Sequence, residues 1–230
     1  MKTTSHLADP DVRIPVGATC LHGDLHLFPE TPSVVLFAHG SGSSRHSLRN
    51  KSVAQVIRDH GCGTLLFDLL TPDEEIEDRA TSALRFDIGL LAQRLVAATR
   101  WIRNRYEPVG LKIGYFGSST GGAAALVAAA ELGKEIAAVV SRGGRPDLAG
   151  PAISRVKSPT LLIVGERDED VLRLNASAFE KLECEKDLKI IPGATHLFEE
   201  QGALQIVAQS AAEWFHAHLE AGVLSIPIAR

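Results

Sequence analysis

Residues 112–130 read KIGYFGSSTGGAAALVAAA, and this stretch decides how the rest of the chain is interpreted. It predicts a buried strand that turns directly into an alanine-rich helix. The turn fits the pattern Gly-x-Ser-x-Gly, with Ser119 between Gly117 and Gly121. The central residue of such a turn has a strained backbone, and a Cβ atom two residues before or after it would clash. Ser119 is therefore predicted to expose its hydroxyl above a sheet, as a candidate nucleophile.

Two other glycine motifs were weighed against this interpretation. A phosphate-binding loop needs a lysine after its last glycine, and Ala123 stands there instead. A dinucleotide fingerprint begins at Gly40 and Gly42, but Arg45 occupies the place of the third glycine. Neither nucleotide motif is complete, so the serine turn is the motif that we retain.

The rest of the chain alternates short apolar runs with helical patterns, which predicts an α/β fold with a doubly wound, mostly parallel sheet. We expect a single domain over residues 1–230. Strands are predicted at 12–17, 19–28, 33–40, 63–70, 112–118, 136–141, 160–165 and 188–193. Helices are predicted at 48–60, 86–105, 120–133, 171–183 and 201–219, and the acidic run 72–79 as a solvated loop or helix start.

A serine nucleophile needs a base that is itself oriented by an acid. In this fold class the acid and then the histidine follow the serine along the chain. Asp168 and His196 each come three residues after a predicted strand, so both should lie at the same edge of the sheet as Ser119. Glu166 and Asp170 remain alternatives for the acid.

An oxyanion hole needs two N–H donors aimed at the charge that develops on the substrate. One candidate is the backbone of Thr120, directly after the serine and at the start of the helix. The second should come from the glycine-rich loop after the strand at 33–40. Ser41 is our choice for this donor, with Gly42 as the neighbouring alternative.

These motifs together resemble the α/β-hydrolase superfamily, and most of all its dienelactone-hydrolase-like branch. The resemblance rests on His39-Gly40, the turn from Gly117 to Gly121, Asp168 within GERDEDV and His196 within GATHLFEE. It covers about residues 12–219 and implies an eight-stranded sheet whose second strand is antiparallel. It also implies hydrolysis of an ester or lactone through an acyl-enzyme. Dienelactone hydrolase itself uses a cysteine nucleophile, and here Ser119 stands in its place.

Two further clusters carry polar side chains of possible functional use. Arg142 follows the strand at 136–141, at the predicted catalytic edge, where it would either bind a substrate carboxylate or pair with a nearby acid. Arg45, Arg79 and Arg85 lie on segments that could also reach this edge. On the strand at 19–28, Cys20, His22, Asp24 and His26 alternate onto one face, but that run also fits the family's strand pattern, so no metal site is expected.

Composition excludes several classes of partner. The formal net charge is −4 with mixed signs, which gives no basic surface for nucleic acid. The three cysteines lack metal or disulfide spacing, and residues 1–17 lack the apolar core of a signal peptide. No membrane association is expected, and we expect a cytoplasmic protein whose oligomeric state the sequence leaves open.

The sequence thus predicts a serine hydrolase that cleaves small carboxylic esters or lactones through an acyl-serine and needs no cofactor. A thioesterase or acyltransferase with the same Ser119, His196 and Asp168 is the alternative enzyme, and a non-catalytic binding protein the alternative class. Only residues 142–159 separate two strands where lids of this superfamily are usually inserted. We therefore expect no cap domain and an open, shallow site.

Overall fold

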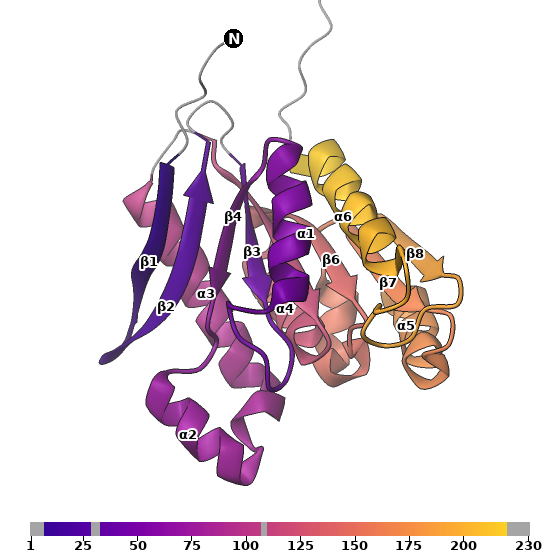
Figure 1. Cartoon of the computed structure of the whole chain (residues 1–230), viewed down its shortest axis with the longest axis horizontal. Helices are drawn as coiled ribbons and strands as arrows, with labels where there is room; N and C mark the ends of the chain where they lie inside the picture. The colour runs from indigo at the N-terminus through magenta and orange to yellow at the C-terminus, as the bar shows by residue number, and fades with distance from the viewer. Residues whose placement is uncertain (1–6, 29–32, 107–109, 220–230) are drawn as a thin grey trace, which may run out of the picture.

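The computed structural model describes residues 7–28, 33–106 and 110–219, which form an eight-stranded sheet with helices on both faces (Figure 1). The strand order is β1-β2-β4-β3-β5-β6-β7-β8. Strand β2 runs antiparallel to its neighbours β1 and β4, and every other pairing is parallel. The strands are β1 (Leu7–Val16), β2 (Thr19–Leu27), β3 (Ser33–Ala38), β4 (Gly63–Phe67), β5 (Lys112–Ser118), β6 (Ile136–Arg142), β7 (Thr160–Gly165) and β8 (Lys186–Ile191). The predicted fold class is confirmed.

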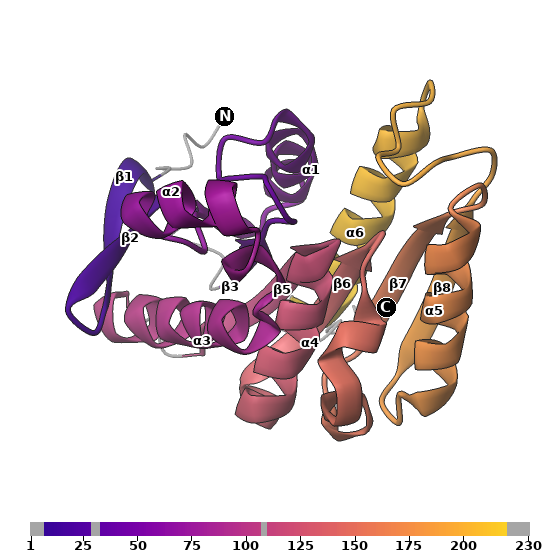
Figure 2. The same ribbon diagram turned by 90° about the horizontal axis from the view of Figure 1, so that it is seen from below.

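The helices form two layers, which Figure 2 shows edge-on. Helices α1 (Leu48–Asp59) and α6 (Ala203–Leu219) cover one face of the sheet. Helices α3 (Ile88–Arg105), α4 (Thr120–Leu132) and α5 (Glu169–Lys181) cover the other. Because both faces are covered, the central strands β3 and β5 are buried along almost their whole length and carry continuous apolar runs.

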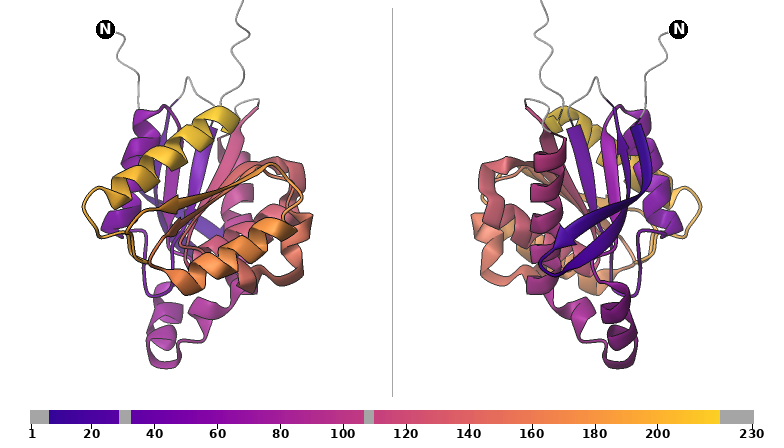
Figure 3. Two further views of the ribbon diagram at one scale, coloured as in Figure 1. Left: turned by 90° about the vertical axis from the view of Figure 1, so that its right-hand side faces the viewer. Right: turned by 90° about the vertical axis from the view of Figure 1, so that its left-hand side faces the viewer.

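The two edges of the sheet differ in what protects them (Figure 3). At one edge β1 and β2 form a twisted antiparallel pair, and at the other β8 lies between α5 and α6. Strand β8 has the sequence KDLKII, and its lysines and aspartate discourage pairing with a further strand. No helix in the described ranges has the length and apolar character that crossing a bilayer requires.

Helix α2 (Pro72–Thr81) is the element that the sequence indicated least clearly, since its acidic run also fitted a loop. It begins at Thr71, whose hydroxyl accepts from the backbone of Glu74 while the Glu74 carboxylate accepts from the backbone of Thr71. This reciprocal capping and Pro72 at the first position explain why a helix forms here. Figure 1 shows α2 projecting beyond the sheet. Short 3₁₀ turns occupy Leu84–Phe86, Gly133–Glu135 and Pro146–Arg155.

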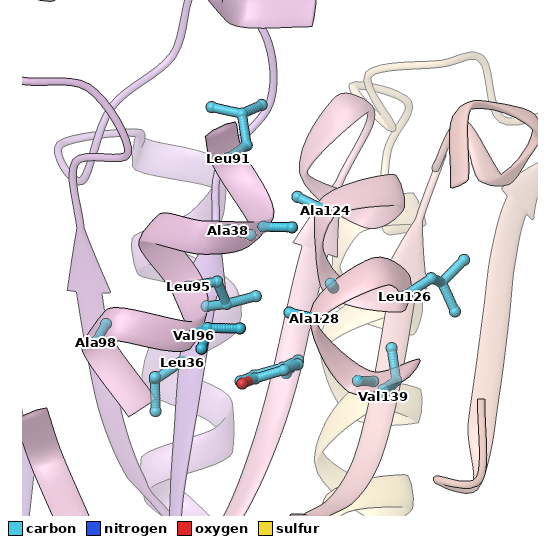
Figure 4. Packing of buried hydrophobic residues seen from close by; sticks show 14 of the residues in the cluster. Leu36, Ala38, Leu91, Leu95, Val96, Ala98, Ala124, Leu126, Ala128 and Val139 are labelled. Atoms are coloured by element: carbon cyan, nitrogen blue, oxygen red, sulfur yellow. The ribbon is translucent and has the colours of Figure 1, made fainter. Parts of the chain in front are cut away.

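The larger hydrophobic core lies between the sheet and the layer of α3 and α4, where Leu95 and Val96 approach Ala124 and Ala128 (Figure 4). The alanines let α4 pack close to α3 and the strands below it. Tyr115 is fully buried in this core, and its hydroxyl lies 2.6 Å from Thr99 Oγ1. Burial raises the pKa of Tyr115, so the hydroxyl stays protonated.

This buried hydroxyl pair predicts a graded loss of stability. Thr99 Oγ1 donates to Leu95 O at 2.9 Å, so Tyr115 is the donor in the 2.6 Å bond. Tyr115→Phe removes that donor together with its own polar atom, and should lower the free energy of unfolding by about 1 kcal/mol. Thr99→Val leaves the Tyr115 hydroxyl buried without an acceptor, and should cost about 1–3 kcal/mol. Urea unfolding of both variants measures the difference, and equal losses would contradict the assigned donor.

Candidate active site

Ser119 lies where β5 ends and α4 begins, in the strained turn that the sequence predicts. Its φ is +52° and its ψ −121°, a conformation that L side chains rarely adopt. The backbone around it is held on both sides: Ser119 N donates to Arg142 O at 3.2 Å, and Ser119 O accepts from Arg145 N at 3.1 Å. These bonds to the segment after β6 hold Ser119 in the strained conformation.

The two flanking glycines are needed for close packing and not for their own dihedral angles. A Cβ atom on Gly117 would lie 2.6 Å from the Cα of Gly122. A Cβ atom on Gly121 would collide with the backbone carbonyl group of Ala38, at the end of β3. The predicted reason for this glycine spacing is therefore confirmed.

The loops after β7 and β8 are joined backbone to backbone. Glu166 N donates to Ile191 O at 3.0 Å, and Arg167 N donates to Ala194 O at 2.9 Å. The Glu166 carboxylate also accepts from Gly193 N at 2.7 Å. Because these bonds fix the two loops relative to each other, the side chains that follow them are placed together.

The imidazole of His196 and the carboxylate of Asp168 meet at this junction. His196 Nδ1 lies 2.6 Å from Asp168 Oδ2, which leaves Nε2 as the ring nitrogen facing away from the acid. The other two candidate acids have different partners: Glu166 bonds Gly193, and the exposed Asp170 pairs with Arg173. Among the three acids considered, Asp168 is the one that the structure brings to His196.

Residues behind the imidazole, which were not predicted from the sequence, hold the backbone that the ring lies against. Gly143, with φ +51°, lies against the ring, since a Cβ atom there would be 3.4 Å from His196 Cε1. The buried Asn175 of α5 donates to Gly144 O at 2.9 Å and so holds this glycine pair. The signal for Asn175 was present, because it is a polar residue on the buried face of α5 with Val171 and Ala178.

The loop after β3 passes close to Ser119. A Cβ atom on Gly40 would lie 3.1 Å from that of Ser119, so the glycine permits this approach. Ser43 N donates to Gly40 O at 3.1 Å and closes the turn. The N–H groups of Ser41 and Gly42 make no hydrogen bond within the described part of the chain. Thr120 N, at the first position of α4, has no intrahelical acceptor.

His39 connects this loop to the one after β4. Its Nε2 accepts from Leu69 N at 3.0 Å, so the proton is on Nδ1, which donates to Gly40 O at 3.0 Å. The side chain is buried, and burial lowers the pKa of His39 below its ordinary value. The neutral histidine therefore acts as a structural clamp between the loops.

Two cavities meet at the loop after β3. The smaller, of about 290 Å³, is lined by Ser119, His196 and Arg142 among others. The larger, of about 580 Å³, is lined by Thr120 and by residues of α2 and the 3₁₀ turn that follows it. Ser41 borders both cavities. Helix α2 supplies one wall of the larger cavity, whereas the prediction of an open, shallow site considered only residues 142–159.

Arg142 is a buried cation without a carboxylate partner among the described residues. The residue is 8% exposed, and its Nε and Nη1 atoms have no hydrogen-bond partner among the described residues. The guanidinium lies over the ring of Phe198, 5.9 Å from the ring centre. Burial and, to a lesser degree, the nearby charge of Arg49 lower the pKa of Arg142 to about 10, so it is charged at neutral pH.

Arg45 and polar residues of β2 have acidic or basic partners of their own. Arg45 pairs with Asp68 and lies 3.4 Å from Asp24, on the strand considered for a metal. His22 of that strand bonds Asp11 at 3.0 Å. Within the described ranges no three His, Cys, Asp or Glu side chains are grouped to hold a metal ion.

The sheet order, the turn at Ser119 and the loops that follow β7 and β8 are those of an α/β hydrolase. The model of the dienelactone hydrolase family matches residues 26–221, so the chain belongs to that family. A crystal structure of a dienelactone hydrolase from Anabaena variabilis is 55% identical, with a TM-score of 0.90 over 94% of this chain and 99% of that chain. Family and structure support hydrolase chemistry.

More distant structures show the fold alone. Est1E from Butyrivibrio proteoclasticus is 15% identical, with a TM-score of 0.74 over 91% of this chain and 99% of that chain. The esterase Pf2001 from Pyrococcus furiosus is 19% identical, with a TM-score of 0.76 over 94% of this chain and 95% of that chain.

A curated relative from Mycobacterium tuberculosis bears the name "Putative phosphoribosyl transferase". It is 52% identical over 214 residues, which are 93% of this chain and 47% of that protein. The chain therefore spans about half the length of the curated relatives it matches. That name describes the longer protein as a whole.

The lowered pKa of His39 predicts how stability depends on pH. Because the folded-state pKa lies below that of an unfolded histidine, about 6.5, the contribution is complete above pH 6.5 and is lost as pH falls toward the folded-state value. The free energy of unfolding should therefore fall between pH 7.5 and 5.5. His39→Gln should be less stable at pH 7.5 and show a flatter profile, measured by urea unfolding. If the free energy of unfolding of the parent and of His39→Gln changed with pH in parallel, His39 would not be the clamp between the two loops.

Proposed function

We propose that this chain hydrolyses small carboxylic esters or lactones through an acyl-serine intermediate on Ser119. The observation that carries the proposal is the placement of His196: Asp168 holds its Nδ1 at 2.6 Å, and the ring lines one cavity with Ser119. A serine in a strained strand-to-helix turn beside an oriented imidazole has the parts that acyl transfer requires.

The reaction would run in two halves. In acylation, His196 Nε2 takes the proton of Ser119 as Oγ attacks the ester carbonyl, and then gives it to the departing alcohol oxygen. In deacylation, His196 takes a proton from water as the water oxygen attacks the acyl carbon, and then gives that proton to Ser119 Oγ as the bond from Oγ to the acyl carbon breaks and the acid is released. Asp168 keeps Nε2 unprotonated at the start of each half and stabilises the imidazolium. The reaction needs no cofactor.

Charge on the carbonyl oxygen would be stabilised from two directions. Thr120 N lies at the N-terminus of the 13-residue helix α4, where the helix dipole favours negative charge. The second donor would be Ser41 N, or its neighbour Gly42 N, from the loop that His39 clamps. Each such donor contributes about 2.7–4 kcal/mol to the transition state.

The same acyl-serine would serve a thioesterase or an acyltransferase, and a binding protein could keep the fold without turnover. A fluorophosphonate probe separates the last class, since it labels a serine that turns over esters and leaves a bystander unlabelled. A thioester substrate tests for thioesterase activity, and an added alcohol acceptor tests for acyltransferase activity. Catalysis is favoured over binding alone because α4 and the clamped loop leave donors open beside Ser119, and hydrolysis is favoured by the family to which the chain belongs.

Ser119→Ala should abolish ester hydrolysis, with kcat reduced about a thousandfold or more, and prevent fluorophosphonate labelling. Its free energy of unfolding should change little, because the hydroxyl has no packing role that the structure shows. Ser118→Ala is the matched control: Ser118 lines the same cavity, but its hydroxyl is engaged as a donor to Asn50 at 3.2 Å, so most of the turnover should remain. Turnover that survives in Ser119→Ala and is lost in Ser118→Ala would refute the nucleophile assignment.

We further propose that Arg142 binds an anionic group of the substrate. A charged side chain this deeply buried is normally paired, and Arg142 has no acid beside it in the described chain. It lines the cavity of Ser119 and His196, so a carboxylate on the substrate would supply the missing partner.

Arg142→Met should remove a preference of about ten- to a hundredfold in kcat/KM for a carboxylate-bearing ester over its neutral analogue. Its free energy of unfolding should stay unchanged or rise, because the substitution removes an unpaired buried charge. In the parent the preference should fall as pH rises through about 10, where Arg142 loses its proton. A variant that keeps the preference, or that loses stability as well, would argue for a structural arginine.

A further inference from the structure

The two cavities beside Ser119 are arranged so that the two halves of an ester would be separated. They share the loop after β3, including Ser41, where the carbonyl oxygen would lie. His196 lines only the smaller cavity, whereas Thr120 lines only the larger one. The assignment of the two cavities to the two halves of an ester rests on the proposed acyl-serine mechanism.

The chemistry of the reaction assigns a half to each cavity. His196 must protonate the departing alcohol oxygen, so the alcohol half lies beside the imidazole in the cavity of about 290 Å³. The acyl half leaves the carbonyl carbon in another direction, past the N-terminus of α4. It therefore extends into the cavity of about 580 Å³ beneath α2.

Arg85 is the side chain best placed to contact that acyl half. Its guanidinium is locked by Asp78: Nε donates to Oδ2 at 2.6 Å and Nη2 donates to the backbone oxygen at 3.0 Å. A third bond runs from Arg85 N to Asp78 Oδ1 at 2.9 Å. The remaining Nη1 makes no hydrogen bond within the described chain, and it lies 3.6 Å from where a Cβ atom on Gly42 would stand.

The charge around Arg85 differs from that around Arg142. Asp78, 5% exposed at its side chain, compensates Arg85, and Glu75 borders the same cavity. Arg142 has no such acid in the described chain. A compensated guanidinium with one open N–H group is suited to a neutral acceptor oxygen, whereas an uncompensated one is suited to an anion.

We propose that the cavity beneath α2 receives the acyl half of the substrate, and that Arg85 Nη1 selects acyl groups carrying a neutral acceptor oxygen, such as a hydroxyl. Leu69, Leu70 and Leu91 line the same cavity and would contact the carbon chain. The preferred substrate class is thus an ester of a short hydroxy acid.

The test compares methyl esters of butyric, 2-hydroxybutyric and 3-hydroxybutyric acid, with each kcat/KM divided by the rate of alkaline hydrolysis to remove intrinsic reactivity. The parent should prefer at least one hydroxy ester by about five- to tenfold. Arg85→Met should bring that ratio to within about twofold of unity. Arg79→Met is the matched control, since Arg79 borders the same cavity but is largely exposed and pairs with Glu75, so it should keep the ratio.

The proposal is overturned if the parent shows no preference, if Arg85→Met keeps it, or if Arg79→Met loses it equally. Asp78→Asn supplies a second variant, because loosening Arg85 should also lower the ratio while the side chain remains. Titration of the esters into Ser119→Ala, with and without Arg85→Met, measures the same selectivity without turnover. If the parent binds the esters selectively but does not cleave them, the proposed hydrolysis is refuted and the acyl cavity is supported. If it cleaves them without selectivity, hydrolysis is supported and the role of the acyl cavity is refuted.

Discussion

The close approach of α4 to β3 and β5 is the constraint on which the site depends. At Gly121 the backbone of α4 touches the carbonyl group at the end of β3, and at Gly117 the strand touches the helix. No side chain fits in either place, and the chain must reverse within one residue. Ser119 therefore takes a left-handed conformation and exposes its side chain. The first N–H group of the helix has no intrahelical acceptor at the same point, because the helix starts there.

Backbone hydrogen bonds, more than side-chain chemistry, determine which acid meets His196. The loops after β7 and β8 are joined through Glu166 and Arg167, so that the next residue, Asp168, meets His196. Glu166 is an equally good acid, but its carboxylate is used to hold the histidine loop at Gly193. Hydrogen bonds likewise position the loop after β3, because the two ring nitrogens of His39 tie it to the loop after β4.

The two arginines near the serine illustrate a conflict between stability and function. A guanidinium buried without an acid costs folding free energy, and the Arg142 guanidinium lies over the ring of Phe198 with no acidic partner in the described chain. Phe198 itself has a positive φ of 55°. Phe198 lies two residues after His196, and Arg142 lines the same cavity as His196. Strain and an unpaired charge so placed are features expected at a functional site. Arg85, compensated by Asp78, carries no such cost.

The sequence by itself determined the order of strands and helices, the strained turn at Ser119 and the positions of Asp168 and His196 at strand ends, because apolar periodicity and glycine spacing are local patterns. It favoured Asp168 for the acid with two nearby acids as alternatives, and only the pairing of two loops distant in sequence shows that Asp168 is the one beside His196. It also missed the wall formed by α2 and the support from Asn175. The wall depends on how the segment between β4 and α3 packs beyond the carboxyl ends of the strands. The support from Asn175 depends on which polar groups meet in the interior. Such contacts form between residues far apart in the chain, so a local pattern such as the polar Asn175 on the buried face of α5 does not identify the partner.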